Sequence, residues 1–247
     1  MNKGWVFIGP DGSSTPIDVP HTWNNLDGQD GGNDYWRGTC VYEKAFPRPD
    51  FGPDQRVYLE FQGVNASAKV ELNGTEVGTH DGGYSTFRWD VTDFLKDENA
   101  LTVHVDNSRN DRVYPQKADF TFYGGIYRDV SLIVVHKRHF DLDHFGGSGL
   151  KVTAKPVDNY TRGEVVVDTW RNCEEGQVHI AIQDAEGKEV AAADLASVKL
   201  SLPNVRLWDG VKDPYLYTAT ATLTVDGREV DQVSARFGVR DFFVDPA

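Results

Sequence analysis

The sequence predicts an all-β protein built from two β-sandwiches, and three observations support this fold class. Its 247 residues, 39% of them hydrophobic, suffice for one large domain or two of ordinary size with real cores. Short runs of alternating apolar and polar residues recur along the chain, with turn residues between them. Helical periodicity is nearly absent, and the one helix-like piece, residues 90–99, is about one turn long.

The first block, residues 1–137, indicates a jelly-roll sandwich with large loops. Its clearest strand is at residues 57–61, where Val57, Leu59 and Phe61 alternate with Tyr58 and Glu60. The dipeptide at 73–74, Asn-Gly, predicts a type I′ turn between two further strands.

The second block, residues 138–247, indicates an immunoglobulin-like sandwich, because about seven short strands fit into its roughly 105 residues. The dipeptide at 226–227, Asp-Gly, predicts a second two-residue hairpin turn. The clearest strands are expected at residues 150–157, 163–170, 177–184, 215–225 and 233–239.

Charge and composition limit the kinds of binding partner and the cellular compartment expected for this protein. The net charge of −13 is spread along the chain, which argues against nucleic acid or an anionic membrane as a partner. No stretch approaches the ~20 apolar residues of a membrane span. The N-terminus has no signal-peptide pattern, and Cys40 and Cys173 match no metal or redox spacing. These features predict a protein of the bacterial cytoplasm that binds no metal through its own motifs.

Catalytic motifs are missing from the sequence. It contains no nucleophile elbow, phosphate-binding loop or dinucleotide fingerprint. Glycoside hydrolysis needs two carboxylates roughly 5–9 Å apart. The sequence marks out no such pair, and we expect no catalytic residue in this chain.

Two loops carry the residue types of a binding site. The first, residues 31–38, contains Asn33 and Asp34 between glycines and aromatics, and the second, residues 107–125, contains Asp119 directly before a run of aromatics. Pyranose rings stack their apolar faces on aromatic side chains, and carboxylates accept hydrogen bonds from sugar hydroxyls. Loops at one end of a sandwich can converge, which favours a carbohydrate site. The alternative is that the aromatics pack at a bend and Asp119 caps a turn.

Several motifs in one order resemble the N-terminal region of glycoside hydrolase family 2 enzymes, the β-galactosidase, β-glucuronidase and β-mannosidase group. The matching pieces are DVPHTW at 18–23, VELNGTEVGTHDGGYSTFRWDVTDFL at 70–95, YGGIYRDVSL at 123–132, LWDGVKDPYLYTATATL at 207–223 and ARFGVRDF at 235–242. The resemblance implies a galactose-binding-like jelly-roll sandwich, then an immunoglobulin-like sandwich, then a TIM barrel that carries both catalytic glutamates. The chain alone is therefore expected to be inactive, with the barrel of the same polypeptide as its partner.

The same resemblance implies roles for the loop residues. Asp119 lies six residues before Gly125, where galactosidases of this family have an aspartate that accepts hydrogen bonds from substrate hydroxyls. The glucuronidases have a similar Asp-Phe-Phe piece, so Asp119 alone does not select the sugar. Asn33 or Asp34 corresponds to a second substrate-binding residue, although the spacing departs from the family pattern.

The function expected from the sequence is the non-catalytic front part of a retaining exo-glycosidase. The preferred interpretation is a β-galactosidase that removes terminal β-D-galactosides in carbohydrate metabolism, with the jelly-roll domain contributing to the sugar subsite. The alternatives are a β-glucuronidase-type member, a free-standing carbohydrate-binding module, and a structural pair of sandwiches without a ligand. No cofactor is expected in the chain. The resemblance allows an alkali or magnesium ion in the full-length enzyme and a homo-oligomer.

Overall fold

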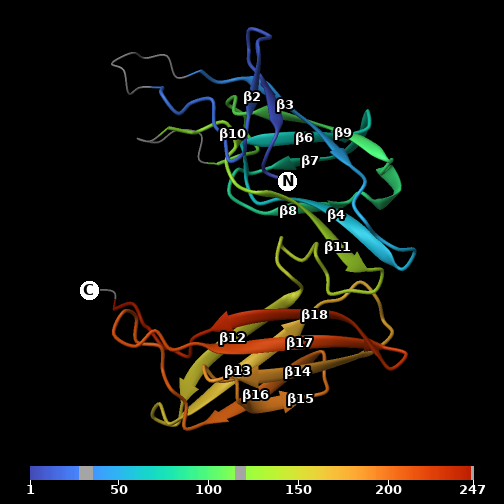
Figure 1. Cartoon of the computed structure of the whole chain (residues 1–247). Helices are drawn as coiled ribbons and strands as arrows, with labels where there is room; N and C mark the ends of the chain where they lie inside the picture. The colour runs from blue at the N-terminus through green and yellow to red at the C-terminus, as the bar shows by residue number, and fades with distance from the viewer. Residues whose placement is uncertain (28–35, 115–120, 246–247) are drawn as a thin grey trace. The chain divides into compact units, whose positions relative to one another are not determined.

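The computed structural model describes residues 1–27, 36–114 and 121–245 (Figure 1). The chain divides into two compact units, Met1–Val135 and His136–Ala247. In the described residues both units consist of β-strands and loops with one short 3₁₀ helix, which confirms the predicted all-β fold. No helix of this described part is long and apolar enough to cross a membrane.

The first unit is a sandwich of two layers. One layer is a six-stranded sheet in the order β2-β1-β3-β9-β6-β7. These strands are β1 (Trp5–Ile8), β2 (Ser14–Ile17), β3 (Thr39–Pro47), β6 (Ser67–Leu72), β7 (Thr75–Asp81) and β9 (Glu98–Asp106). The other layer is the sheet β11-β4-β8, next to a small pair of β10 and β5. Its elements are β4 (Gln55–Phe61), β5 (Val64–Asn65), β8 (Phe87–Asp90), β10 (Gly125–Ile126) and β11 (Val130–His136), with the 3₁₀ helix η1 at Thr92–Phe94.

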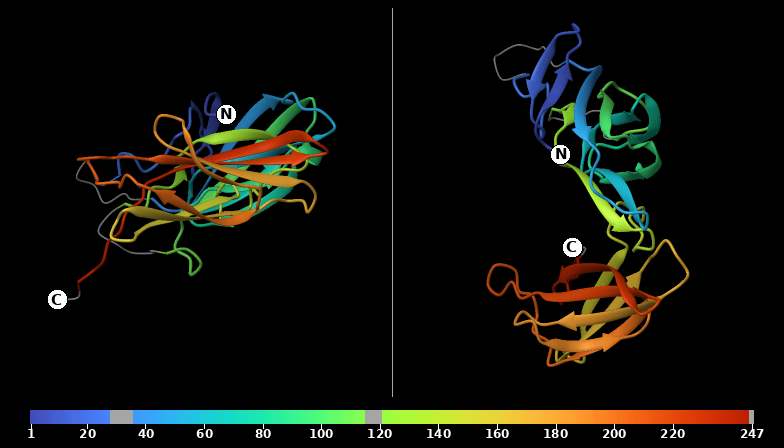
Figure 2. Two further views of the ribbon diagram at one scale, coloured as in Figure 1. Left: turned by 90° about the horizontal axis from the view of Figure 1, so that it is seen from below. Right: turned by 45° about the vertical axis from the view of Figure 1, so that its right-hand side comes forward.

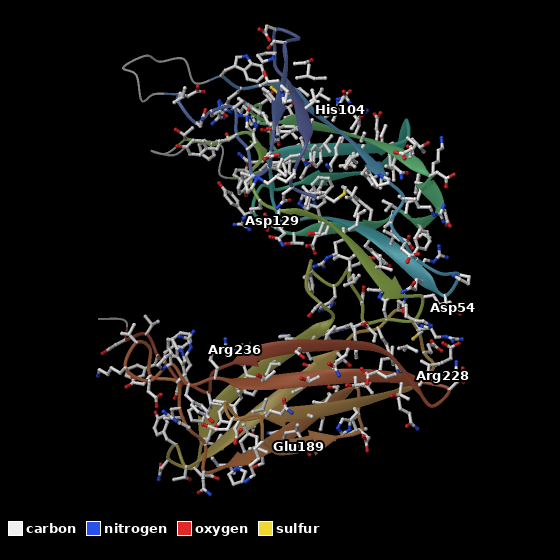
Figure 3. The ribbon with its side chains drawn as sticks, viewed as in Figure 1. Asp54, His104, Asp129, Glu189, Arg228 and Arg236 are labelled. Carbon is white, nitrogen blue, oxygen red and sulfur yellow. The ribbon has the colours of Figure 1, made fainter. Side chains whose placement is uncertain are left out.

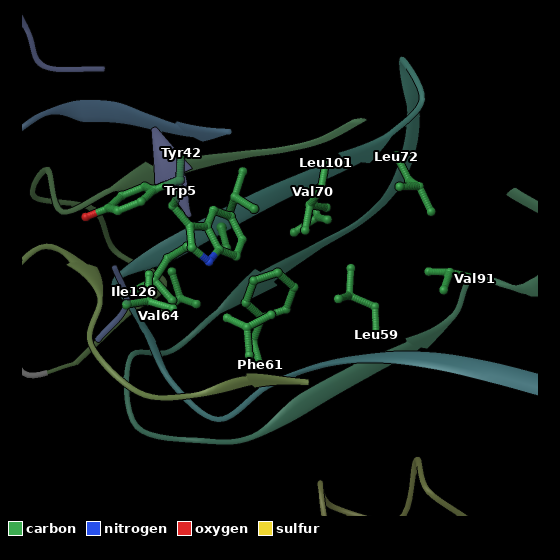
Figure 4. Packing of buried hydrophobic residues seen from close by; sticks show 14 of the residues in the cluster. Trp5, Tyr42, Leu59, Phe61, Val64, Val70, Leu72, Val91, Leu101 and Ile126 are labelled. Carbon is green, nitrogen blue, oxygen red and sulfur yellow. The ribbon is translucent and has the colours of Figure 1, made fainter. Parts of the chain in front are cut away.

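The core of the first unit lies between these layers (Figure 4). Val57, Leu59 and Phe61 of β4 are fully buried, and they share one cluster with residues of the opposite sheet such as Val70 and Leu101. The alternation in this stretch therefore predicted the core face correctly. Burial of aliphatic and aromatic side chains of this size contributes about 1.5–3 kcal/mol each relative to exposure.

The opposite face of β4 is also covered, which the alternating pattern did not predict. Tyr58 is 8% exposed and Glu60 is 7% exposed. The Glu60 carboxylate lies 2.6 Å from the Arg88 guanidinium, and both side chains are about nine-tenths buried. A carboxylate can be buried here because it is paired, whereas an unpaired buried charge would cost several kcal/mol.

The second unit is an immunoglobulin-like sandwich of seven described strands (Figures 1 and 2). They form the sheets β12-β13-β16 and β15-β14-β17-β18 around one apolar cluster. The strands are β12 (Leu150–Val157), β13 (Arg162–Thr169), β14 (Gln177–Gln183), β15 (Glu189–Ala193), β16 (Ser197–Pro203), β17 (Tyr217–Val225) and β18 (Arg228–Phe237). Exposed charges mark the outer surface, and Arg228 and Arg236 lie near the two ends of β18 (Figure 3).

Both predicted two-residue hairpin turns are present. Asn73 and Gly74 join β6 to β7 with φ angles of 56° and 78°, and Asp226 and Gly227 join β17 to β18 with φ angles of 52° and 73°. Positive φ at both central residues is the type I′ geometry, whose twist matches that of the strands. The Asn73 side chain also donates a hydrogen bond to the Phe94 carbonyl, which fixes the first turn against η1.

Candidate functional site

The three residues predicted to contact substrate, Asn33, Asp34 and Asp119, lie outside the described residues. They belong to the segments 28–35 and 115–120, and the structure describes the chain on both sides of each segment. The candidate site is therefore built from the residues that border these two segments.

Asn24 holds both ends of the first segment. Its side chain is fully buried, and its Nδ2 donates to Asp27 Oδ2 at 2.6 Å and to the Trp36 carbonyl at 2.9 Å. Asp27 and Trp36 are the described residues on either side of 28–35, and Trp36 N also donates to Asp27 Oδ2 at 3.2 Å. Asn24 Oδ1 accepts a hydrogen bond from Gly124 N at 2.8 Å, close to the end of the second segment.

Asn107 connects the same centre to both loops. It follows β9 and is 2% exposed. Its Nδ2 donates to Asn24 Oδ1 at 3.1 Å and to the Phe122 carbonyl at 3.2 Å, and its Oδ1 accepts from Gly38 N at 3.0 Å. We call Asn24 and Asn107 the asparagine pair. It ties both described ends of segment 28–35, and the residues that follow segment 115–120, to one buried point of the first unit.

Packing against Trp23 and the local backbone conformation explain the two consecutive glycines at 124–125. The Trp23 and Trp36 rings meet edge to face with centroids 5.9 Å apart. A Cβ atom at Gly124 would lie 2.0 Å from the Trp23 ring, so a larger residue cannot occupy this position without moving the tryptophan. Gly125 has a φ of 139°, in a region that L-residues rarely adopt. The glycines thus serve packing and backbone geometry.

Other polar residues of the second loop pair with the protein itself. Arg112 binds the carboxylate of Asp81 with two hydrogen bonds, of 2.7 and 3.4 Å. This hydrogen bond from Arg112 lowers the pKa of Asp81, and a second one from Ser67 adds to the effect. Within the described ranges, no group of three or more His, Cys, Asp or Glu side chains is arranged to hold a metal ion.

Two half-buried histidines lie in the first unit. His21 Nδ1 is 2.8 Å from the Tyr42 hydroxyl, and burial lowers the pKa of His21. His80 stacks on Phe87 with ring centroids 4.0 Å apart, and burial likewise lowers the pKa of His80. Burial therefore disfavours the protonated form of both imidazoles.

The described structure is thus a jelly-roll sandwich followed by an immunoglobulin-like sandwich. Residues 29–136 match the family model described as "Glycosyl hydrolases family 2, sugar binding domain", and residues 148–240 match that of "Glycosyl hydrolases family 2". The chain belongs to glycoside hydrolase family 2.

The known relatives that the chain matches are longer enzymes of this family. It is 30% identical to a β-glucuronidase of Bacteroides fragilis, over 100% of this chain and 38% of that protein. It is 25% identical to a β-galactosidase of Thermoanaerobacter pseudethanolicus, over 97% of this chain and 33% of that protein. The crystal structure of an "FMN-binding beta-glucuronidase from Facaelibacterium prausnitzii L2-6" superposes with a TM-score of 0.90 at 38% identity, covering 97% of this chain and 38% of that one. The chain thus spans about two fifths of the length of such relatives and corresponds to their N-terminal region.

The asparagine pair predicts a large stability effect at Asn107. Asn107→Ala should lower the free energy of unfolding of the first unit by about 2–4 kcal/mol, because it leaves buried groups such as Gly38 N without a partner. Ser14→Ala, which changes an exposed side chain of β2 in the same unit, should shift it by no more than about 0.5 kcal/mol. Urea denaturation measures both values, and equal values for the two variants would contradict a central role of the pair.

The histidines predict a pH dependence. The pKa values of His21 and His80 are lower in the folded chain than the unfolded value of about 6.5. Their neutral forms therefore contribute stability that is fully present above about pH 6.5 and is lost as pH falls through the folded pKa values. The double variant His21→Asn, His80→Asn should show a smaller loss of stability between pH 7 and pH 5 than the native chain. Denaturation at both pH values tests this, and an unchanged loss would refute it.

Proposed function

We propose that the chain is the non-catalytic, sugar-subsite part of a retaining exo-glycosidase that acts on β-D-glucuronides. Two of the three relatives described above are β-glucuronidases, and one of them has the same fold at 38% identity over almost the whole chain. The catalytic glutamates are supplied by a TIM barrel in the full-length polypeptide. This proposal replaces β-galactosidase, the activity preferred from the sequence alone, as the first choice.

The asparagine pair is the structural observation that supports a role in the sugar subsite. It fixes both described flanks of segment 28–35, which carries Asn33 and Asp34, and the flank that follows segment 115–120, which carries Asp119. Fixed flanks reduce the conformational freedom that a loop loses when it contacts substrate, so less binding energy is spent on ordering. In this proposal Asp119 accepts a hydrogen bond from a sugar hydroxyl, and Asn33 or Asp34 contributes a second polar contact.

β-Galactosidase remains the second candidate. It is supported by the β-galactosidase relative that matches 97% of the chain, and by the position of Asp119 before the Gly-Ile-Tyr-Arg motif. The two substrates differ at C6, which is a carboxylate in glucuronides and a hydroxymethyl group in galactosides, and in the orientation of the C4 hydroxyl. Discrimination at C6 therefore requires a group that pairs with a carboxylate.

The activity of the full-length polypeptide distinguishes the two candidates. Its kcat/KM for p-nitrophenyl β-D-glucuronide should exceed that for p-nitrophenyl β-D-galactoside by at least ~100-fold, because a paired carboxylate contributes about 3 kcal/mol and 1.36 kcal/mol is tenfold. The opposite ratio would establish the second candidate. Hydrolysis of neither glycoside would reject both.

Asp119 gives the second test. In the full-length polypeptide, Asp119→Asn should lower kcat/KM by about one to two decades, because it weakens a charge-assisted hydrogen bond to substrate. The melting temperature should hardly change if the side chain serves substrate. The matched control is Asp111→Asn, which changes an exposed aspartate earlier in the same loop and should retain full activity. A destabilised Asp119 variant with normal turnover would instead make Asp119 a turn-capping residue.

A further inference from the structure

An open hollow of about 400 Å³ lies on the second unit, at one end of the sheet β15-β14-β17-β18. We call it the Arg236 hollow. Its volume falls within the range of small-molecule binding sites, which is roughly 300–1,000 Å³. The residues that line it include Gln183, Asp184, Asp213, Tyr215, Thr218 and Arg236.

Three polar side chains from neighbouring strands form a row at the base of the hollow. Thr218 of β17 is in register with Arg236 of β18 on one side and with Gln183 of β14 on the other. Residues in register on neighbouring strands share one face of the sheet, so these side chains lie next to one another. Across the described residues, none of the three side chains has a hydrogen-bond or ion-pair partner. Their polar atoms are therefore available to a ligand.

Two loops form the walls of the hollow, and hydrogen bonds hold them together. In the turn between β14 and β15, Asp184 Oδ1 accepts hydrogen bonds from Glu186 N at 3.1 Å and from Lys188 N at 2.8 Å. The loop before β17 contains Tyr215. Its hydroxyl accepts a hydrogen bond from Ala185 N at 3.1 Å and donates one to Glu186 Oε2 at 3.2 Å. Walls fixed in this way lower the cost of ordering the site when a ligand binds.

Arg206 holds the second wall from behind. Its guanidinium lies 4.4 Å from the centroid of the Tyr215 ring and donates two hydrogen bonds of 2.9 Å to the carboxylate of Asp213. A carboxylate has about four lone-pair sites, so Asp213 can accept further hydrogen bonds from a ligand in the hollow. The same holds for Asp184, whose Oδ1 accepts two backbone N–H groups.

The hollow combines donors and acceptors with little net charge. Arg236 only donates, whereas Gln183 and Thr218 both donate and accept. The carboxylates of Asp184 and Asp213 only accept. One cation and two carboxylates among the described lining residues give a net charge of −1, so the hollow disfavours an anion. A neutral ligand with several hydroxyl groups matches this set, because each hydroxyl both donates and accepts.

We propose that the Arg236 hollow binds a neutral sugar residue of a glycan. Arg236 and Gln183 donate hydrogen bonds to sugar hydroxyls, and the carboxylates of Asp184 and Asp213 accept hydrogen bonds from others. The ring of Tyr215 borders the apolar part of the sugar. The inference goes beyond the proposed function, which assigns no ligand to the second unit. It does not depend on which glycoside the full-length polypeptide cleaves.

Titration of the 247-residue chain tests the proposal directly. The chain is labelled with ¹⁵N, and methyl β-D-glucoside or methyl β-D-galactoside is added while the amide and arginine Nε signals are followed by NMR. At least one of these glycosides should shift the signals of Ala185, Gly187 and Arg236, with a Kd of roughly 1–10 mM because the hollow is open to solvent. Methyl β-D-glucuronide should bind at least about threefold more weakly, since its carboxylate meets those of Asp184 and Asp213.

Two arginine variants separate a role in the site from a general effect of charge. Arg236→Gln should weaken the binding of the neutral glycoside about tenfold, because it removes hydrogen bonds from a charged donor. Arg228→Gln is the matched control. It changes an exposed arginine at the other end of the same strand, outside the hollow, and should leave the Kd unchanged (Figure 3).

Four outcomes would overturn the inference. The first is the absence of shifts in the hollow with either neutral glycoside up to roughly 100 mM, at which a Kd of 10 mM gives about 90% saturation. The others are the same shifts with glycerol, tighter binding of the glucuronide than of both neutral glycosides, and equal Kd values for the two arginine variants. Cleavage of glucuronides by the full-length polypeptide, combined with any of these outcomes, would reject the site and leave the proposed function intact.

Discussion

The hydrogen bonds of two buried asparagine side chains, Asn24 and Asn107, fix the backbone at one end of the first sandwich. An amide side chain both donates and accepts, and in a dry environment each of its groups requires a partner. Here the partners are backbone groups of chain stretches far apart in the sequence, including Trp36, Gly38 and Phe122. Removing one partner leaves others unpaired, so the arrangement forms as a whole or is lost as a whole. These hydrogen bonds fix the backbone on both sides of segment 28–35 and directly after segment 115–120.

Packing around the asparagine pair carries this constraint outward to the surface. Gly124 allows Trp23 to approach the backbone, and Trp23 in turn supports Trp36 at the end of the first segment. Directly before Gly124 lies Tyr123, whose ring is exposed and whose carbonyl accepts a hydrogen bond from Asn65. The buried polar centre and the exposed ring of Tyr123 thus belong to one local arrangement.

The sequence predicted the features of this protein that depend on local physics. The hairpin turns at 73–74 and 226–227 follow from the ability of Asn, Asp and Gly to adopt positive φ, and the core strands follow from alternation. Strand β15 was not predicted individually, because it is rich in alanine, which has low β propensity. Burial of asparagine depends on tertiary partners, so Asn24 was not identified and Asn107 was assigned to a binding loop. Substrate preference was not predictable either, because the galactosidases and the glucuronidases of this family have similar aspartate motifs at the position of Asp119.

The central claim is that the asparagine pair positions loops whose side chains contact the sugar. A crystal structure of the full-length polypeptide with a glucuronic acid inhibitor in its active site would test this most directly. The account predicts that the Asp119 carboxylate lies within about 3 Å of a sugar hydroxyl, with the hydrogen bonds of Asn24 and Asn107 intact beneath the loops. A carboxylate that instead accepts hydrogen bonds only from its own backbone, with no loop residue near the sugar, would contradict it.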